Sequence, residues 1–264
     1  MSVAQKNSAP NASSPSFSTR TAVRIEGVNK RFGSVQAVRD ISLQIPERSL
    51  CGFLGPNGAG KSTTLRMLCT VLYPDSGEAL IDGHVVEREP IAARRLIGVL
   101  SHASGLYPHL TGAENIVYFG ELHGLSRVES RRRADELIVL LDLADCASRR
   151  AKGYSQGQRL KTALARALVH SPRNLVLDEP TNGLDVMAVR GLRSLLNKLR
   201  DAGQCILFSS HVMQEVAMLC DDVVVIAHGT VVAQGTPDGL RERAGEPGLE
   251  DAFVKLIGSG EGLG

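Results

Sequence analysis

The chain has 264 residues, of which 43% are apolar and 22% are charged, and its formal net charge is +2. This composition is ordinary for a globular protein, and the length allows one α/β domain or two small ones with a substantial core. So small a positive charge does not argue for nucleic acid, and we expect no nucleic-acid partner; we interpret the arginine cluster Arg131–Arg133 as a solvated helix face. No apolar run approaches the roughly 18 residues of a membrane span, so we expect the chain not to cross a membrane by itself.

The chain has five cysteines, an odd number with no C-x-x-C pair. Most of them lie within apolar runs, and their spacing does not fit a metal site. We therefore predict buried thiols in a reducing compartment. The five are Cys51, Cys69, Cys146, Cys205 and Cys220.

The first 21 residues are rich in Ser, Ala, Asn and Pro and show no apolar periodicity, which predicts a flexible tail over residues 1–21. This segment lacks the apolar core of a signal peptide. The folded part is predicted to begin near Ala22 with a strand at Val23–Val28. Strict alternation at Ile41–Ile45 indicates a half-buried strand, and the short apolar run Ser49–Leu54 suits a buried one.

A phosphate-binding loop is predicted directly after this buried strand. The pattern G-x-x-x-x-G-K-[ST] is matched without exception by Gly55, Pro56, Asn57, Gly58, Ala59, Gly60, Lys61, Ser62 and Thr63. The glycines let backbone N–H groups surround an anion, and the start of the next helix adds free donors and a positive dipole end. We expect Lys61 to reach the β- and γ-phosphates and the Ser62 hydroxyl to bind Mg²⁺. A turn that binds nothing and a dinucleotide loop, which has a different glycine order, are the weaker interpretations.

The middle of the chain is predicted to be a helical insert. A short strand at Glu78–Ile81 and another at Ile97–Leu100 precede it. Thr111–Glu114 and Ser126–Glu129 then fit the capping box S/T-x-x-E, and each predicts the start of a helix. We place the insert at about residues 103–155.

An α/β alternation resumes after the insert, which predicts βαβ units and a mainly parallel sheet with ligands at the carboxyl ends of its strands. The early strands are predicted to form an antiparallel side layer. The later elements are a helix at Gln158–His170, a strand at Asn174–Leu177, a helix at Val186–Arg200, a strand at Cys205–Ser209, a helix from about Val212 and a strand at Asp222–Ala227.

Two adjacent carboxylates, Asp178 and Glu179, follow the predicted strand that ends at Leu177. An Asp-Glu pair at a strand end is by itself more often a surface turn. Because a phosphate loop lies upstream, we expect Asp178 to bind Mg²⁺ directly or through water. We expect Glu179 to accept a proton from the water that attacks the γ-phosphate.

These residues resemble the ATP-binding subunits of ABC transporters over about residues 22–243. The segment after Tyr154 is similar to the family signature L-S-G-G-Q, with Ser155, Gln156, Gly157 and Gln158. The segment Pro180–Asp185 is similar to the loop that carries the family's aspartate, here Asp185. His211 stands where the family has its switch histidine, and Phe32 stands where an aromatic ring stacks on adenine.

The resemblance implies a P-loop NTPase of the ABC ATPase type, with residues 22–245 as the ATPase domain and residues 246–264 as a C-terminal helix and tail. It implies a head-to-tail dimer, with a second copy expected, in which the signature segment of one subunit covers ATP bound by the other. Mg²⁺ is the implied metal, and His211 would contact the γ-phosphate. A separate integral membrane permease is the implied partner, so we expect a peripheral subunit on the cytoplasmic face of the inner (cell) membrane.

Two residues depart from the family pattern. Gln156 replaces a Gly, which we expect to alter only a solvent-facing side chain because Ser155 and Gly157 remain. His102 replaces a Gln whose amide oxygen does not titrate, whereas His titrates near pH 6.5. As a metal ligand His102 is therefore doubtful, and ATPase activity is hypothesised to fall as it gains a proton. A neutral substitution without a pH role is the alternative.

The segment Leu249–Phe253 resembles one in subunits paired with ABC-2 exporter permeases, including sodium-efflux and drug-efflux systems. Residues 102–109, with Tyr107 and Pro108, are the predicted contact to the permease. A GTPase would need N-K-x-D, and both Asn-Lys pairs of the chain lack the Asp. The alternative function is a soluble ABC ATPase that acts on ribosomes or nucleic acid, but such proteins usually carry two cassettes or long coiled-coil insertions.

Overall fold

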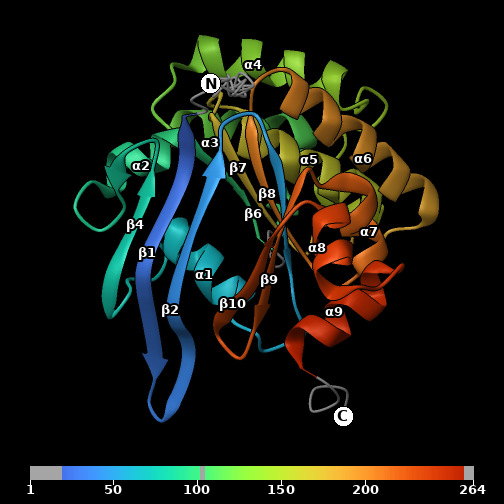
Figure 1. The fold of residues 1–264 in the computed structure, drawn as a ribbon. Helices are drawn as coiled ribbons and strands as arrows, with labels where there is room; N and C mark the ends of the chain where they lie inside the picture. The colour runs from blue at the N-terminus through green and yellow to red at the C-terminus, as the bar shows by residue number, and fades with distance from the viewer. Residues whose placement is uncertain (1–19, 102–104, 259–264) are drawn as a thin grey trace, which may run out of the picture.

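The computed structural model describes residues 20–101 and 105–258 (Figure 1). Among these residues the larger sheet has six strands in the order β10-β9-β3-β8-β7-β6. They are β3 (Leu50–Leu54), β6 (Ile97–Leu100), β7 (Asn174–Asp178), β8 (Cys205–Ser210), β9 (Asp222–Ala227) and β10 (Thr230–Gly235). The edge strand β10 pairs antiparallel with β9, and the other neighbouring pairs are parallel.

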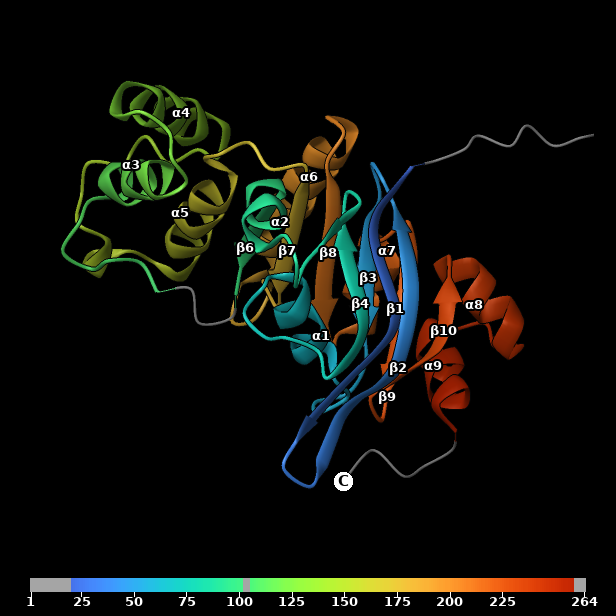
Figure 2. The ribbon, with the colours of Figure 1, turned by 90° about the vertical axis from the view of Figure 1, so that its left-hand side faces the viewer.

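A second sheet forms the antiparallel side layer, in the order β2-β1-β4-β5. Its strands are β1 (Thr21–Phe32), β2 (Val35–Pro46), β4 (Ser76–Ile81) and β5 (His84–Val85). Helix α1 (Lys61–Leu68) lies between the two sheets (Figures 1 and 2), where Leu65, Met67 and Leu68 are buried. The two sheets and the helices confirm the predicted fold class.

The larger sheet is covered on both faces, which explains why its central strands are apolar throughout. In β3, Leu50 and Leu54 belong to the core shared with the later helices, whereas Cys51 and Phe53 face α1 and the side layer. Successive side chains of a strand point to opposite faces, so a strand buried on both faces reads as a continuous apolar run. The same alternation continues in β8 and β9.

A group of helices stands beside the sheets (Figure 2). It contains α3 (Gly112–Leu122), α4 (Arg127–Leu140), the short 3₁₀ helix η1 (Ala151–Gly153) and α5 (Gln156–Leu168). The predicted capping box of α3 is present, because Glu114 N donates to Thr111 Oγ1 at 3.1 Å and Thr111 N donates to Glu114 Oε2 at 2.8 Å. At α4, Ser126 Oγ accepts from Glu129 N at 3.2 Å.

The remaining helices are α2 (Pro90–Leu96), α6 (Val186–Asp201), α7 (Met213–Leu219), α8 (Pro237–Ala244) and α9 (Leu249–Ile257). The helices α2 and α8 were not predicted, because each is short and buries few side chains, so neither shows apolar periodicity. The strand β1 extends beyond the predicted Val28. Its polar end is held by pairing across a tight turn, with Phe32 opposite Val35.

All five cysteines are buried and free, as predicted. Within the described ranges, no helix is long and apolar enough to cross a membrane. Nearly all of the predicted tail 1–21, and residues 259–264, lie outside the described residues. The domain limits near residues 21 and 245 stay predictions.

Candidate functional site

The phosphate loop joins the end of β3 to the start of α1. A Cβ atom at Gly55 would lie 2.2 Å from Ile226 O, so only glycine fits against strand β9 at this position. Gly60 precedes α1 with φ of 104°, a conformation that L side chains rarely adopt. No side chain caps the N-terminus of α1 within the described part of the chain. The first N–H groups of the helix are therefore available to an anion.

Lys61 lies in this loop with 5% of its surface exposed. Its Nζ donates to Gly55 O at 2.6 Å and to Pro56 O at 3.1 Å. Glu179 Oε1 lies 3.8 Å from the same nitrogen. Burial lowers the pKa of Lys61, and the charges of Glu179 and Asp178 oppose that shift. The ammonium group is thus held close to the backbone that would surround a phosphate.

Asp178 ends β7 and is 8% exposed. Its Oδ1 accepts from Ser62 Oγ at 3.0 Å and from Ser209 Oγ at 2.7 Å. The structure therefore joins Ser62 and Asp178, which are 116 residues apart in the sequence. A hydroxyl and a carboxylate are oxygen donors of the kind that Mg²⁺ prefers, and Mg²⁺ usually keeps several waters, so two protein oxygens fit this ion.

Glu179 and His211 face one another at the ends of β7 and β8. His211 Nδ1 lies 2.8 Å from Glu179 Oε2. The backbone of Glu179 has φ of 51°, a left-handed conformation that is uncommon for a residue other than glycine. Glu179 N donates to Ser209 Oγ at 2.9 Å, which helps to hold this conformation.

These groups surround a cavity of about 770 Å³. Its lining includes the predicted adenine-stacking residue Phe32, residues 57–63 of the phosphate loop, Asp178, Glu179 and His211. Phe32 is 47% exposed, and Lys30 Nζ lies 5.7 Å from its ring centroid. The site therefore brings together predicted residues from four separate parts of the sequence.

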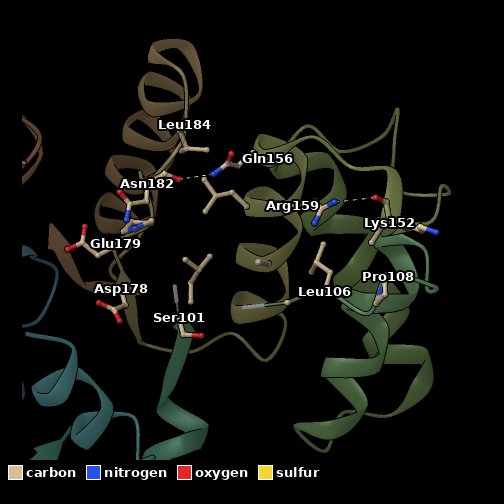
Figure 3. Close-up of a pocket in the computed structure, with 16 residues that line it drawn as sticks. Ser101, Leu106, Pro108, Lys152, Gln156, Arg159, Asp178, Glu179, Asn182 and Leu184 are labelled. Carbon is tan, nitrogen blue, oxygen red and sulfur yellow. Dashed lines mark hydrogen bonds between the residues drawn. The ribbon is translucent and has the colours of Figure 1, made fainter. Parts of the chain in front are cut away.

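The signature segment lies on the helical side of the molecule. Ser155 Oγ accepts from Gln158 N at 3.3 Å, and Gln158 Oε1 accepts from Ser155 N at 3.1 Å, so the pair caps α5 as a capping box. Gln156 is exposed to solvent, and its side chain also forms a hydrogen bond within the chain. Its Nε2 donates to Asn182 O at 2.9 Å, and both residues line a neighbouring cavity of about 600 Å³ (Figure 3). Gln156 is thus solvent-facing, as expected, and its side chain also joins the start of α5 to the loop after β7.

The loop after β7 carries the predicted Asp185. Asp185 Oδ1 accepts from Ala188 N at 2.8 Å and so caps α6. His102 lies outside the described residues, and so do Ala103 and Ser104. Sequence reasoning missed Ser209, which contacts both Asp178 and Glu179, because a serine at a strand end has no motif of its own.

Comparison with known proteins identifies the family. The family model described as ABC transporter matches residues 38–182, more than half of the chain. The chain belongs to the ABC transporter family. The ABC transporter ATP-binding protein NatA of Bacillus subtilis (strain 168) is 41% identical over 224 residues, which are 84% of this chain and 91% of that protein.

Two further relatives of this ABC transporter subunit support its activity. The daunorubicin/doxorubicin resistance ATP-binding protein DrrA of Streptomyces peucetius is 41% identical over 85% of this chain and 68% of its own length. A dimeric structure of the ATP-binding cassette MJ0796 in a post-hydrolysis state with ADP and Pi has a TM-score of 0.74 and 27% identity, over 81% of this chain and 98% of that one. The chain is thus a nucleotide-binding, ATP-hydrolysing transport ATPase. The relatives support transport over the alternative of action on ribosomes or nucleic acid.

Proposed function

We propose that the chain powers export through a separate membrane permease and hydrolyses ATP as a head-to-tail dimer, with a second copy of itself as the simplest partner. The observation that carries the proposal is the assembly of Lys61, Ser62, Asp178, Glu179 and His211 around one cavity. Phosphoryl transfer to water depends on positioning and on neutralising charge, and these residue types supply both.

ATP binding is proposed to use three parts of the site. Phe32 would stack on adenine, and its exposed ring at the mouth of the cavity supports this role. The backbone N–H groups between Asn57 and Thr63 would hold the phosphate oxygens. Lys61 would add a positive charge at the β- and γ-phosphates, where a buried ammonium group is screened little by solvent.

Mg²⁺ is proposed to be held by the Ser62 hydroxyl and the Asp178 carboxylate, which already lie 3.0 Å apart. When bound, this ion would neutralise charge on the phosphate oxygens. Ser209 donates to the same Asp178 oxygen at 2.7 Å and so orients the carboxylate. A third contribution from His102 stays a prediction, because His102 lies outside the described residues.

Glu179 is proposed to accept the proton of the attacking water. Its Oε2 lies 2.8 Å from His211 Nδ1, and its Oε1 lies 3.8 Å from Lys61 Nζ. These neighbours fix the direction in which the carboxylate points. His211 would in turn contact the γ-phosphate, as an exposed ring beside the cavity allows.

Dimerisation is proposed because the start of α5 in the signature segment is exposed and can face ATP bound by another subunit. Ser155 and Gln156 are exposed at the start of α5, where N–H groups and the helix dipole suit a γ-phosphate. The dimeric form of MJ0796, a cassette of the same fold, supports this arrangement. Asp185 at the start of α6 would lie near the dimer interface.

Export is proposed from the resistance function named for DrrA and from the segment Leu249–Phe253. This segment begins α9, and its apolar side chains Leu249, Ala252 and Phe253 pack into the fold. The described part of the proposed permease contact, residues 105–109, contains exposed Tyr107. Alanine at Tyr107 and Pro108 should reduce transport in membranes while basal hydrolysis continues. A peripheral position on the cytoplasmic face of the cell membrane follows from such a contact.

The deciding experiment compares Mg²⁺-dependent ATP hydrolysis by the wild-type chain and by Glu179→Gln, with sedimentation in the presence of ATP. We expect the variant to lose hydrolysis by at least about 100-fold and to sediment as an ATP-bound dimer. Glu250→Gln, a change at an exposed carboxylate of α9, is the matched control and should keep wild-type activity. Wild-type rates in Glu179→Gln would overturn the proposed role of this residue.

A further inference from the structure

We propose that Glu215 is a positioning residue for ATP hydrolysis, an inference that rests on the proposed function. Glu215 lies in the first turn of α7 and belongs to none of the nucleotide-binding motifs. Its Oε2 accepts from Thr181 Oγ1 at 2.7 Å and from Ser210 Oγ at 3.1 Å. One carboxylate oxygen thus joins the loop that follows Glu179 to the residue that precedes His211.

The hydroxyl of Ser210 has a second contact that encloses His211. Val212 N donates to Ser210 Oγ at 2.9 Å, so this bond closes a turn around the histidine. A serine hydroxyl has one proton, and here Glu215 accepts it. The side chain of Ser210 is fully buried, so it has no water with which to exchange this bond. Glu215 therefore fixes the backbone from which the imidazole projects.

The bond from Thr181 to Glu215 supports Glu179, the residue that His211 contacts. Thr181 is 8% exposed and lies two residues after Glu179, whose left-handed backbone needs support from its surroundings. Ser209 holds this backbone on one side, through the amide of Glu179, and Glu215 holds it on the other, through Thr181. Glu215 thus supports both sides of the 2.8 Å contact between His211 and Glu179, through Thr181 after Glu179 and through Ser210 before His211.

The phosphate loop does not depend on these bonds. The hydrogen bonds of Lys61 and Ser62 go to Gly55, Pro56 and Asp178, none of which is hydrogen-bonded to Glu215 in the described part of the chain. Glu179 Oε1 lies 3.8 Å from Lys61 Nζ, which is beyond hydrogen-bond distance. Loss of the Glu215 carboxylate should therefore misplace the group that activates water while ATP binding persists. A misplacement of about 1 Å near the reacting atoms can reduce a rate by about 100-fold.

The test measures kcat and KM for Mg²⁺-ATP hydrolysis in Glu215→Ala, Glu215→Gln and Thr181→Val. We expect Glu215→Ala to lower kcat by roughly 10- to 100-fold and to change KM by less than about threefold. Glu215→Gln keeps an acceptor oxygen for both hydroxyls and should restore most of the rate. Thr181→Val removes one of the two bonds and should give an intermediate kcat.

A purely structural role would not produce this pattern. Glu242→Ala, at an exposed carboxylate of α8, is the control for charge and should match wild type. Unchanged kcat in Glu215→Ala, or equal losses in the Ala and Gln variants, would overturn the inference. Should Glu215→Ala not fold, Glu215→Gln and Thr181→Val decide by the same criteria.

The two proposals fail in different ways. When wild type hydrolyses ATP and Glu179→Gln does not, a wild-type kcat in Glu215→Ala refutes the positioning role alone. A wild-type chain that shows no hydrolysis even with its permease would refute the proposed function and this inference together.

Discussion

The strand ends of the larger sheet and the helical side of the molecule differ in how many of their proposed ATP-site residues are already held in place by contacts within one chain. At the strand ends, Lys61, Asp178, Glu179 and His211 already contact one another or their neighbours. On the helical side, the Ser155 side chain caps its own helix, and Gln156 reaches back only to Asn182. Groups that are held before a ligand arrives lose less freedom on binding. The strand ends are therefore prepared for ATP, whereas the signature segment needs a second surface.

The largest effect should come from a substitution in the phosphate loop at the strand ends, at Gly55. In Gly55→Ala the new Cβ would lie 2.2 Å from the backbone oxygen of Ile226, so the loop or strand β9 must move. We expect ATP binding to be lost and the free energy of unfolding to fall by about 3 kcal/mol. Isothermal titration and urea unfolding measure both quantities.

Gly58→Ala is the matched control for this change. Gly58 has φ of 79°, but nothing lies within 4 Å of the added Cβ, so the variant suffers backbone strain alone. This strain should cost about 1 kcal/mol. Equal behaviour of the two variants would show that close packing against β9 does not shape the phosphate loop.

A smaller effect should appear on the helical side, where the free energy of unfolding should depend on pH. The rings of His123 and His170 stack with centroids 3.6 Å apart, and His170 Nε2 lies 3.1 Å from Ile97 O of β6. Burial, followed by the proximity of His123, lowers the pKa of His170 to about 4. Burial also lowers the pKa of His123. The folded state therefore holds His170 neutral where the unfolded chain protonates it.

The sign follows from proton binding. Between pH 6.5 and about 4 the unfolded state binds more protons at His170, so stability is complete above this window and is lost as the pH falls through it. The loss should approach roughly 2 to 3 kcal/mol at the lower end. Urea unfolding at pH 7 and pH 5 should show a weaker pH dependence in His170→Gln than in wild type. His109→Gln, at an exposed histidine, should keep the wild-type dependence, and a matching loss there would refute this assignment.

The smallest effect concerns the bond between the two regions. Gln156→Gly introduces the residue that the family pattern has and removes the 2.9 Å hydrogen bond to Asn182 O. A single exposed hydrogen bond contributes about 1 kcal/mol or less, so unfolding should change little. Amide hydrogen exchange across residues 182–185 should rise by up to about fivefold. Gln156→Ala should act alike, and an effect in the glycine variant alone would point to backbone freedom instead.

The sequence predicts those features of the site whose residues lie close together along the chain, and it misses those whose residues lie far apart. The phosphate loop, the adjacent carboxylates Asp178 and Glu179 and the caps of α3 and α4 are short patterns formed by residues close in the sequence, so spacing alone predicts them. The short helices α2 and α8 bury too few residues to show an apolar periodicity in the sequence. The bond from Gln156 to Asn182 was also not predicted, because 26 residues separate its partners.

The sequence by itself thus predicted the fold class and the chemistry of the phosphate loop, because these depend on local spacing and on apolar periodicity, and its motifs carried the resemblance to the family that the comparisons show. Only the tertiary structure decided that Ser62 meets Asp178, that His211 meets Glu179 and that Glu215 joins the loop after β7 to the end of β8. These contacts arise because β3, β8 and β7 lie side by side in the sheet although they are far apart in the chain. Strand order is set by the packing of the whole core, and no short segment records it.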